Sequence, residues 1–161
     1  MESSFWHERW QKNAIGFHQE EINPQLKEFW PGLKLPPHSA VFVPLCGKSR
    51  DMLWLHERGH EVIGVELSPI AARDFYAENK IPSKSTSRGK FEQWEGGGIK
   101  ILVGDFFNLD SSHLADVAGV YDRASLIALP LDMRPNYAAH LAAILRPEAE
   151  ILLVTLEYPQ A

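Results

Sequence analysis

The stretch between residues 40 and 66 constrains the fold of this chain more than any other. An apolar run at 40–45 leads into a turn that contains Gly47, and a helix-like segment follows. A second apolar run at 62–65 then ends in Glu66. Strand, turn, helix, strand and acid in this order are typical of nucleoside-binding units in doubly wound sheets. We therefore predict an α/β fold, with a Rossmann-like, doubly wound and mostly parallel sheet and flanking helices.

The composition of the turn narrows the choice of cofactor. Glu66 follows Gly47 by 19 residues, about the spacing at which the dinucleotide fingerprint places its ribose-binding carboxylate. NAD and FAD sites need several glycines around the pyrophosphate, and this turn has one. Lys48 and Ser49 imitate the end of a Walker A loop, yet Phe42 stands where that loop needs its first glycine. A P-loop nucleotide-binding protein is thus a poor alternative, and S-adenosylmethionine, with a ribose and no phosphate, is favoured.

Three segments carry distinctive motifs: FWHERWQKNAIGFHQ at 5–19, VPLCGKS at 43–49 and LWLHERGHEVIGVELS at 53–68. They resemble the bacterial branch of the thiopurine S-methyltransferase family, and the similarity covers residues 4–158. The resemblance implies transfer of the methyl group of S-adenosylmethionine to the sulfur of aromatic or heterocyclic thiols such as thiopurines. It also links the chain to methylation of selenium or tellurium compounds. Because family members continue with a further helix and a strand pair, we expect the usual C-terminal elements to be absent here.

Some candidate cofactor contacts follow from the residues themselves. Gly47 lets the backbone approach a ligand closely because it has no side chain. The carboxylate of Glu66 can accept hydrogen bonds from both ribose hydroxyls, and we favour this role over a solvated acid at a strand end. Asp105 and Phe106 follow the apolar run at 99–103 and are placed to contact adenine. A helix cap at Asp105 and a core ring at Phe106 are about equally compatible with the sequence.

The family resemblance implies further contacts. It matches Trp10, Leu45 and Arg123 to cofactor-contacting positions, and it matches Phe17 to a position near the acceptor. Judged without it, the two aromatic residues and the leucine would be core packing, and the arginine would form a surface ion pair. We expect the segment at 4–19 to form an amphipathic lid helix whose aromatic side chains cover the cofactor or the acceptor.

The expected chemistry needs no catalytic residue and no metal. An aromatic heterocyclic thiol is partly ionised near neutral pH, so its sulfur can attack the methyl group in line once both are held in place. Cys46 lacks a base at motif spacing and is interpreted as a small packing residue. His18 lies beside the lid segment and is a candidate to assist the transfer, but an ordinary surface histidine is the favoured interpretation. If the acceptor pocket is incomplete, the alternative is a non-catalytic module that binds S-adenosylmethionine.

Periodicity predicts the remaining elements. Apolar runs predict strands, and amphipathic segments bounded by caps, Pro or Gly predict helices. Residues 82–98 are rich in Ser, Lys, Arg and Gly, which predicts an exposed connection. We expect helices at 4–19, 23–30, 50–58, 69–79 and 133–145, and strands at 40–45, 62–65, 99–103, 117–121 and 151–156.

Composition restricts the partners and the compartment. The 161 residues, 45% of them hydrophobic, predict one domain spanning 1–161. A net charge of −5 argues against nucleic acid as a partner, and a long apolar span for a membrane is missing. One cysteine and the lack of a signal peptide favour a cytoplasmic protein. We expect a monomer that binds a small-molecule thiol, although an uncovered edge strand would invite self-association.

Overall fold

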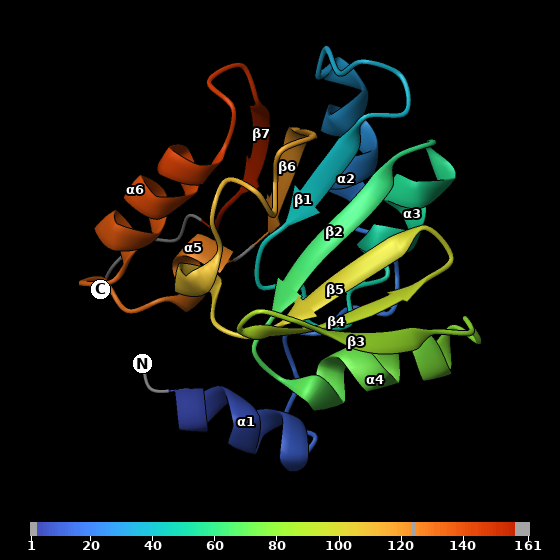
Figure 1. Ribbon diagram of the computed structural model, residues 1–161, viewed down its shortest axis with the longest axis vertical. Coiled ribbons are helices and arrows are strands. Elements are labelled where there is room, and N and C mark those ends of the chain that lie inside the picture. Colours follow the sequence, from blue (N-terminus) through green and yellow to red (C-terminus); the bar gives the residue numbers. More distant parts are fainter. Residues whose placement is uncertain (1–2, 124, 157–161) are drawn as a thin grey trace.

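The computed structural model describes residues 3–123 and 125–156. Its centre is one sheet with the strand order β3-β4-β5-β2-β1-β6-β7 (Figure 1). Strands β5, β2, β1, β6 and β7 run parallel, whereas β4 runs antiparallel to both of its neighbours, β3 and β5. This arrangement confirms the predicted mostly parallel, doubly wound sheet. The strands are β1 (Ala40–Val43), β2 (Glu61–Glu66), β3 (Lys84–Arg88), β4 (Phe91–Gly96), β5 (Ile99–Val103), β6 (Val117–Arg123) and β7 (Glu150–Val154).

Helices cover both faces of the sheet (Figure 1). One hydrophobic cluster joins α2, α3 and α4 to one face, and a second joins α5, α6 and the 3₁₀ helix η2 to the other. The described helices are α1 (Ser3–Gln11), α2 (Pro24–Phe29), α3 (Asp51–Glu57), α4 (Pro69–Glu78), α5 (Ser125–Ala128) and α6 (Arg134–Ile144), with 3₁₀ helices η1 (Trp30–Gly32) and η2 (Phe106–Asn108).

Strand β1 is buried on both faces, as its uninterrupted apolar sequence requires. Successive side chains of a strand point to opposite faces, so Val41 and Val43 enter the first cluster while Phe42 enters the second. The strand ends at Val43, two residues before the predicted end. Pro44 has no N–H to donate, and Leu45 takes a left-handed conformation with φ of 46°. The chain therefore turns away from the sheet at this point.

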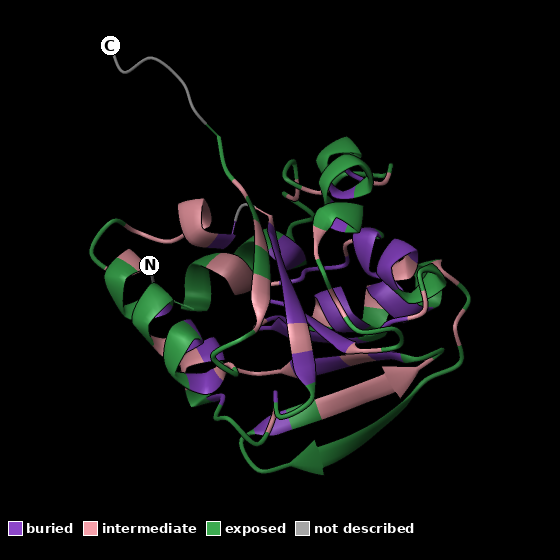
Figure 2. Cartoon of the chain, turned by 90° about the horizontal axis from the view of Figure 1, so that it is seen from above, coloured by how far each residue is buried: buried purple, intermediate pink, exposed green. Residues whose placement is uncertain are grey.

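The segment at 82–98 is not the exposed connection that its composition predicts. It forms a β-hairpin in which β3 pairs with β4 and β4 pairs with β5. Gly89 has φ of 58° in the two-residue loop between Arg88 and Phe91, which suits a tight hairpin turn. Strand β3 is exposed along its whole length because it lies at the sheet edge (Figure 2). An exposed edge strand needs no apolar face, so its polar sequence resembles that of a loop.

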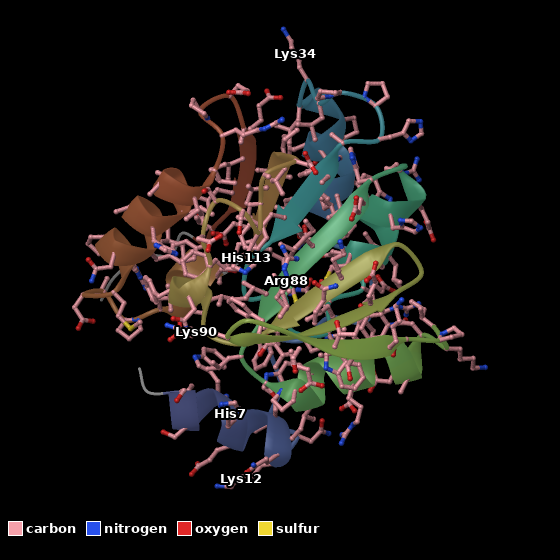
Figure 3. The ribbon with its side chains drawn as sticks, viewed as in Figure 1. His7, Lys12, Lys34, Arg88, Lys90 and His113 are labelled. Carbon is pink, nitrogen blue, oxygen red and sulfur yellow. The ribbon has the colours of Figure 1, made fainter. Side chains whose placement is uncertain are left out.

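The predicted lid helix at 4–19 is also too long. Helix α1 ends at Gln11, and Asn13 adopts a left-handed conformation with φ of 52°. The N–H of Asn13 donates to the carbonyl of Trp10, and that of Ala14 donates to the carbonyl of Arg9. These two bonds form a Schellman C-cap, which Asn can support in place of Gly. The rest of the segment is a loop, and Lys12 extends into solvent at its start (Figure 3).

No helix among residues 3–123 and 125–156 combines the length and the hydropathy that a membrane span requires. The longest described helix, α6, has 11 residues, and about 20 apolar residues are needed to cross a bilayer.

Candidate active site

A cavity of about 250 Å³ lies at the carboxyl ends of β1, β2, β5 and β6, with α1 and the following loop on its open side. The chain proceeds from β1 toward β5 on one side and returns to β6 on the other, so the cavity sits at the topological switch point. Ligands of open α/β sheets bind in this place. Every site residue predicted from the sequence lines the cavity: Trp10, Phe17, Leu45, Gly47, Glu66, Phe106 and Arg123.

The turn after β1 brings backbone close to the cavity. Leu45 and Gly47 have φ of 46° and 55°, both in the left-handed region. For Leu45 this conformation costs about 1–2 kcal/mol, which the surrounding structure must supply. A Cβ atom on Gly47 would lie 3.3 Å from Cζ2 of Trp10, tighter than most real contacts. Glycine is therefore favoured here for two reasons: the backbone conformation and the indole ring packed against it.

Glu66 is held in place by backbone donors. Its Oε2 accepts a hydrogen bond from the N–H of Gly47 at 2.9 Å, and its Oε1 accepts one from the N–H of Ser68 at 2.9 Å. Burial raises the pKa of Glu66, while the backbone bonds partly oppose that shift. Each carboxylate oxygen has a second lone pair, so the group can still accept hydrogen bonds from a ligand in the cavity. A hydrogen bond thus links the carboxylate of Glu66 directly to the turn that contains Gly47.

Aromatic rings form the lid side of the cavity. Trp10 is 5% exposed, and its ring lies 5.6 Å from that of Phe17 in an edge-to-face contact. The ring of Phe17 also contacts Trp6 at 5.7 Å. Trp10 is both a core residue and a lid residue, because it is buried and lines the cavity. Phe17 is 42% exposed and lies at the rim of the cavity. A flat ligand ring can lie against such a surface.

Arg123 ends β6 and lines the cavity. Its Nη1 donates to Oε1 of Gln19, a neutral partner in the loop after α1. The neighbouring Asp122 does not pair with it and instead accepts hydrogen bonds from Tyr137 Oη at 2.6 Å and Ser125 N–H at 3.1 Å. Because Arg123 has no ion-pair partner among the residues that the structure describes, its guanidinium is available to an anionic group of a ligand.

Asp105 is a helix cap and Phe106 is a core ring, and both residues also line the cavity. Oδ1 of Asp105 accepts from the N–H of Phe107 at 2.9 Å and so caps η2. The ring of Phe106 is 4% exposed and packs against Tyr137 at 4.8 Å and His140 at 5.3 Å. Phe106 is therefore a core ring that also lines the cavity, where a ligand can contact it.

Two buried aspartates anchor the site, and sequence analysis missed both. The carboxylate of Asp122 accepts a hydrogen bond from the hydroxyl of Tyr137 in α6. The hydroxyl of Ser125 donates to the carbonyl of Pro44 at 2.8 Å. This network ties α5 and α6 to the turn after β1. Burial raises the pKa of Asp122. Its position at a strand end, like that of Glu66, is the signal that could have found it.

Asp51 performs the same task on the opposite face of the sheet. Its Oδ2 accepts from the hydroxyl of Tyr121 at 2.8 Å, and its Oδ1 accepts from the N–H of Asn23 at 2.9 Å. The side chain of Asn23 in turn caps α2 through the N–H groups of Gln25 and Leu26. No sequence motif indicates these contacts because the partners are 28 and 70 residues apart.

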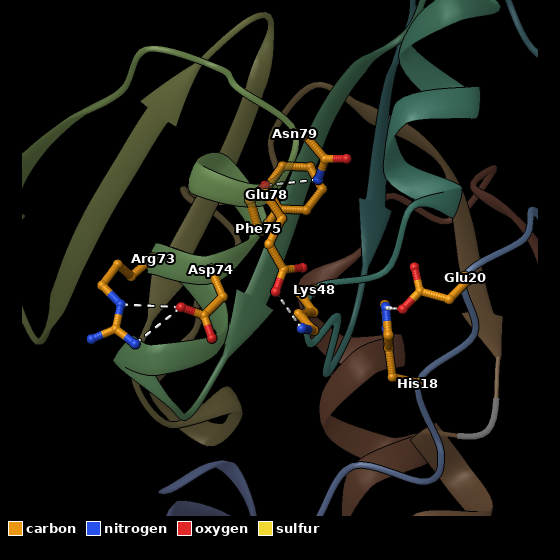
Figure 4. Close-up of polar contacts among 8 residues, drawn as sticks. All are labelled: His18, Glu20, Lys48, Arg73, Asp74, Phe75, Glu78 and Asn79. Carbon is orange, nitrogen blue, oxygen red and sulfur yellow. Dashed lines mark hydrogen bonds and ion pairs between the residues drawn. The ribbon is translucent and has the colours of Figure 1, made fainter. Parts of the chain in front are cut away.

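His18 is not the surface histidine that the sequence suggests. Its side chain is 10% exposed and lines the cavity next to Phe17. Burial is the main cause that lowers the pKa of His18, and the ammonium of Lys48 adds to it. Lys48 itself forms an ion pair with Glu78 at 2.7 Å, so its ammonium is engaged within the protein (Figure 4). This pairing counts against the phosphate-binding role of a P-loop lysine.

Cys46 is a packing residue, as predicted. It is 5% exposed and free, and its Sγ would lie 2.6 Å from a Cβ atom on Gly64. Burial raises the pKa of the thiol far above its usual range, so it stays protonated and unreactive at neutral pH.

Comparison with known proteins identifies relatives along the whole chain. The model of the family "Thiopurine S-methyltransferase (TPMT)" matches residues 1–161. The thiopurine S-methyltransferase of Nitrosospira multiformis is 53% identical over 161 residues, which are all of this chain and 73% of that protein. The enzyme of the same name from Pseudomonas entomophila is also 53% identical, with 74% of its length covered. The chain thus spans about three quarters of these relatives.

Solved structures share the fold. A Burkholderia thailandensis 1,6-didemethyltoxoflavin-N1-methyltransferase, with bound 1,6-didemethyltoxoflavin and S-adenosylhomocysteine, superimposes with a TM-score of 0.62 at 21% identity. The match covers 90% of this chain and 56% of that one. A glycopeptide N-methyltransferase complexed with S-adenosyl-L-methionine gives a TM-score of 0.61 at 18% identity, over 84% of this chain and 56% of that one. At these identities the likeness establishes the fold alone.

Proposed function

The chain belongs to the thiopurine S-methyltransferase family, and from this premise we propose that it transfers the methyl group of S-adenosylmethionine to the sulfur of an aromatic or heterocyclic thiol. Family membership makes the chain a methyltransferase with S-adenosylmethionine as its methyl donor. Thiopurines are the acceptor class that the names of the relatives suggest. Selenium and tellurium compounds stay a prediction from the resemblance.

The observation that carries the proposal is that Gly47 and Glu66 lie together in one wall of the cavity. The N–H of Gly47 donates a hydrogen bond to the Glu66 carboxylate at 2.9 Å and holds it in place, and the cavity leaves room for a ligand sugar beside it. A fixed carboxylate with free lone pairs suits a ribose, which offers two hydroxyl donors. We infer that the adenosyl group lies here, with Trp10, Leu45, Phe106 and Arg123 in contact with the cofactor and Phe17 with the acceptor.

The proposed reaction is a direct in-line transfer. The acceptor thiolate attacks the methyl carbon, and the electron pair of the breaking bond stays on the cofactor sulfur. Thiolate and sulfonium lose their charges together, so a cavity lined mainly by aromatic and aliphatic side chains favours the transition state over the ions. Most of the rate then comes from holding the sulfur and the methyl group in line.

Methyl-transfer assays with 6-mercaptopurine and thiophenol test the proposal. We expect both compounds to be methylated at sulfur, with S-adenosylhomocysteine formed in equal amount. Titration calorimetry with S-adenosylhomocysteine separates the alternatives. Tight binding without turnover of any thiol would support a non-catalytic module, and binding of ATP in place of S-adenosylhomocysteine would favour the P-loop interpretation.

A further inference from the structure

We propose that His18 accepts the proton of acceptor thiols that are not ionised at neutral pH, as their sulfur attacks the methyl group. This inference deepens the thiol methylation proposed above and rests on it. It concerns the acceptor side of the cavity, where Phe17 and His18 follow one another in the loop after α1. The inference assigns a base to a reaction that otherwise depends on the acidity of its substrate.

Other titratable side chains that line the described part of the cavity are already engaged. Lys48 is paired with Glu78, and the buried thiol of Cys46 is protonated. The hydroxyls of Tyr121 and Tyr137 donate to buried aspartates, and burial raises the pKa of both phenols. None of these groups can take up a proton at neutral pH. Proton transfer from a thiol must therefore go to another group.

Three further groups in the cavity wall serve the cofactor side. Glu66 is held between two backbone N–H donors, Asp105 caps η2, and Arg123 has no acceptor atom. In the lid loop His18 is the one cavity-lining side chain that combines a basic nitrogen with burial. It also lies beside Phe17, the residue matched to the acceptor.

The surroundings of His18 keep it neutral but able to accept charge. Burial lowers the pKa of His18, as do the charges of Lys48 and Arg123, while Glu20 and Glu78 raise it. The imidazole is therefore neutral at pH 7. The carboxylate of Glu20 is available to stabilise the imidazolium, whereas that of Glu78 is paired with Lys48. Figure 4 shows the His18–Glu20 pair and the Lys48–Glu78 pair. A base with a pKa somewhat below neutrality is suited to general base catalysis at pH 7.

Glu20 stabilises the charge that His18 acquires in this step. Nε2 of His18 lies 3.7 Å from Oε1 of Glu20, within reach of an ion pair with the imidazolium but beyond hydrogen-bond distance. The ring nitrogen that carries no proton takes the thiol proton as the S–H bond breaks and the new S–C bond forms. The methyl–sulfonium bond breaks with its electron pair moving to the cofactor sulfur. The imidazolium returns its proton to water beside Glu20, whose side chain is 82% exposed.

The test compares two acceptors of different acidity in His18→Gln. Thiophenol is largely ionised near neutral pH, whereas benzyl mercaptan, like a cysteine thiol with a pKa of about 8.5, is not. We expect kcat/KM to fall by about 100-fold for benzyl mercaptan and by less than about threefold for thiophenol. An equal loss of kcat/KM with both thiols would assign His18 a structural role and overturn the inference. Full activity of His18→Gln with benzyl mercaptan would overturn it as well.

The pH profile provides an independent readout. With benzyl mercaptan, the wild-type rate should change little between pH 7 and pH 8, because a histidine with a lowered pKa is already neutral there. In His18→Gln the rate should instead rise about tenfold per pH unit up to the pKa of the thiol itself. Parallel profiles for the two proteins would overturn the inference.

Two controls separate this inference from the proposed function. His7→Gln changes a histidine of the same lid that does not line the cavity, and it should leave both rates unchanged (Figure 3). Affinity for S-adenosylhomocysteine should be the same in His18→Gln as in the wild type. If the wild type binds S-adenosylhomocysteine but methylates neither thiol, the thiol acceptor class is wrong and the inference falls with it.

Discussion

At the residue scale, the site depends on positions where one residue has more than one function. Gly47 allows a left-handed turn, accepts the indole ring of Trp10 against its Cα atom, and donates its N–H to Glu66. Asp122 similarly satisfies α6 and the start of α5 with a single carboxylate. Changes at such positions should alter stability and binding in ways that can be separated.

Gly47→Ala should cost both stability and binding, and Gly89→Ala offers a matched control. Both glycines have φ near 55–58°, but a Cβ atom on Gly89 would meet nothing within 4 Å. Each variant should lose about 1 kcal/mol of unfolding free energy from the strained backbone, measured by urea denaturation. Only Gly47→Ala should also bind S-adenosylhomocysteine more weakly. Equal affinity in the two variants would contradict the proposed close approach of the ligand at Gly47.

Asp122→Asn should change the pH dependence of folding. Burial raises the pKa of Asp122 above its ordinary value of 3.8, so its protonated form stabilises the fold below that pH. This contribution is lost as the pH rises through the raised pKa, because the buried group must then carry a charge. The unfolding free energy of the wild type relative to Asp122→Asn should therefore fall between pH 4 and neutrality. A difference that grows with pH over this range would show the opposite shift.

At the element scale, α1 and its loop are held on the sheet by few side chains. Helix α1 is mostly exposed, and Trp10 is its one buried residue among those described. The helix ends at a cap only two residues beyond Gln11, after which the loop carries Phe17 and His18 to the cavity. The lid is therefore a short helix plus a folded loop, anchored at the indole ring.

Trp10→Ala should release the lid without unfolding the sheet. Loss of the indole contacts should weaken S-adenosylhomocysteine binding by at least about tenfold and raise amide hydrogen exchange in α1. Phe5→Ala is the control, because Phe5 is 38% exposed on the same helix and does not line the cavity. Unchanged affinity of Trp10→Ala for S-adenosylhomocysteine would show that the lid does not contribute to cofactor binding.

At the scale of the whole molecule, the cavity joins segments from Ser3 to Tyr137 in sequence. The sequence was sufficient for β1 and β2, and for Gly47 and Glu66 as residues of the cavity wall, because these depend on apolar runs and a local motif. It was insufficient for His18, because no local pattern shows how far other segments bury a side chain of a loop. The hairpin at 82–98 was missed for a similar reason, since an edge strand does not show the apolar pattern of a buried one.

Because the cavity draws on several elements, ligand binding should stabilise the fold as a unit. S-adenosylhomocysteine at 100 times its Kd should raise the unfolding free energy by about 2.7 kcal/mol. Thermal unfolding followed by circular dichroism measures this effect, with ATP at the same concentration as the control. Stabilisation by ATP alone would place a different ligand in the cavity.

A crystal structure of the chain with S-adenosylhomocysteine would show whether the adenosyl group occupies the cavity beside Gly47 and Glu66. We predict density for the adenosyl group beside the turn at Gly47, with both ribose hydroxyls within hydrogen-bond distance of the Glu66 carboxylate. The cofactor sulfur should face Phe17 and His18. Density for the nucleoside elsewhere, or a cavity that stays empty at saturating ligand, would contradict the account.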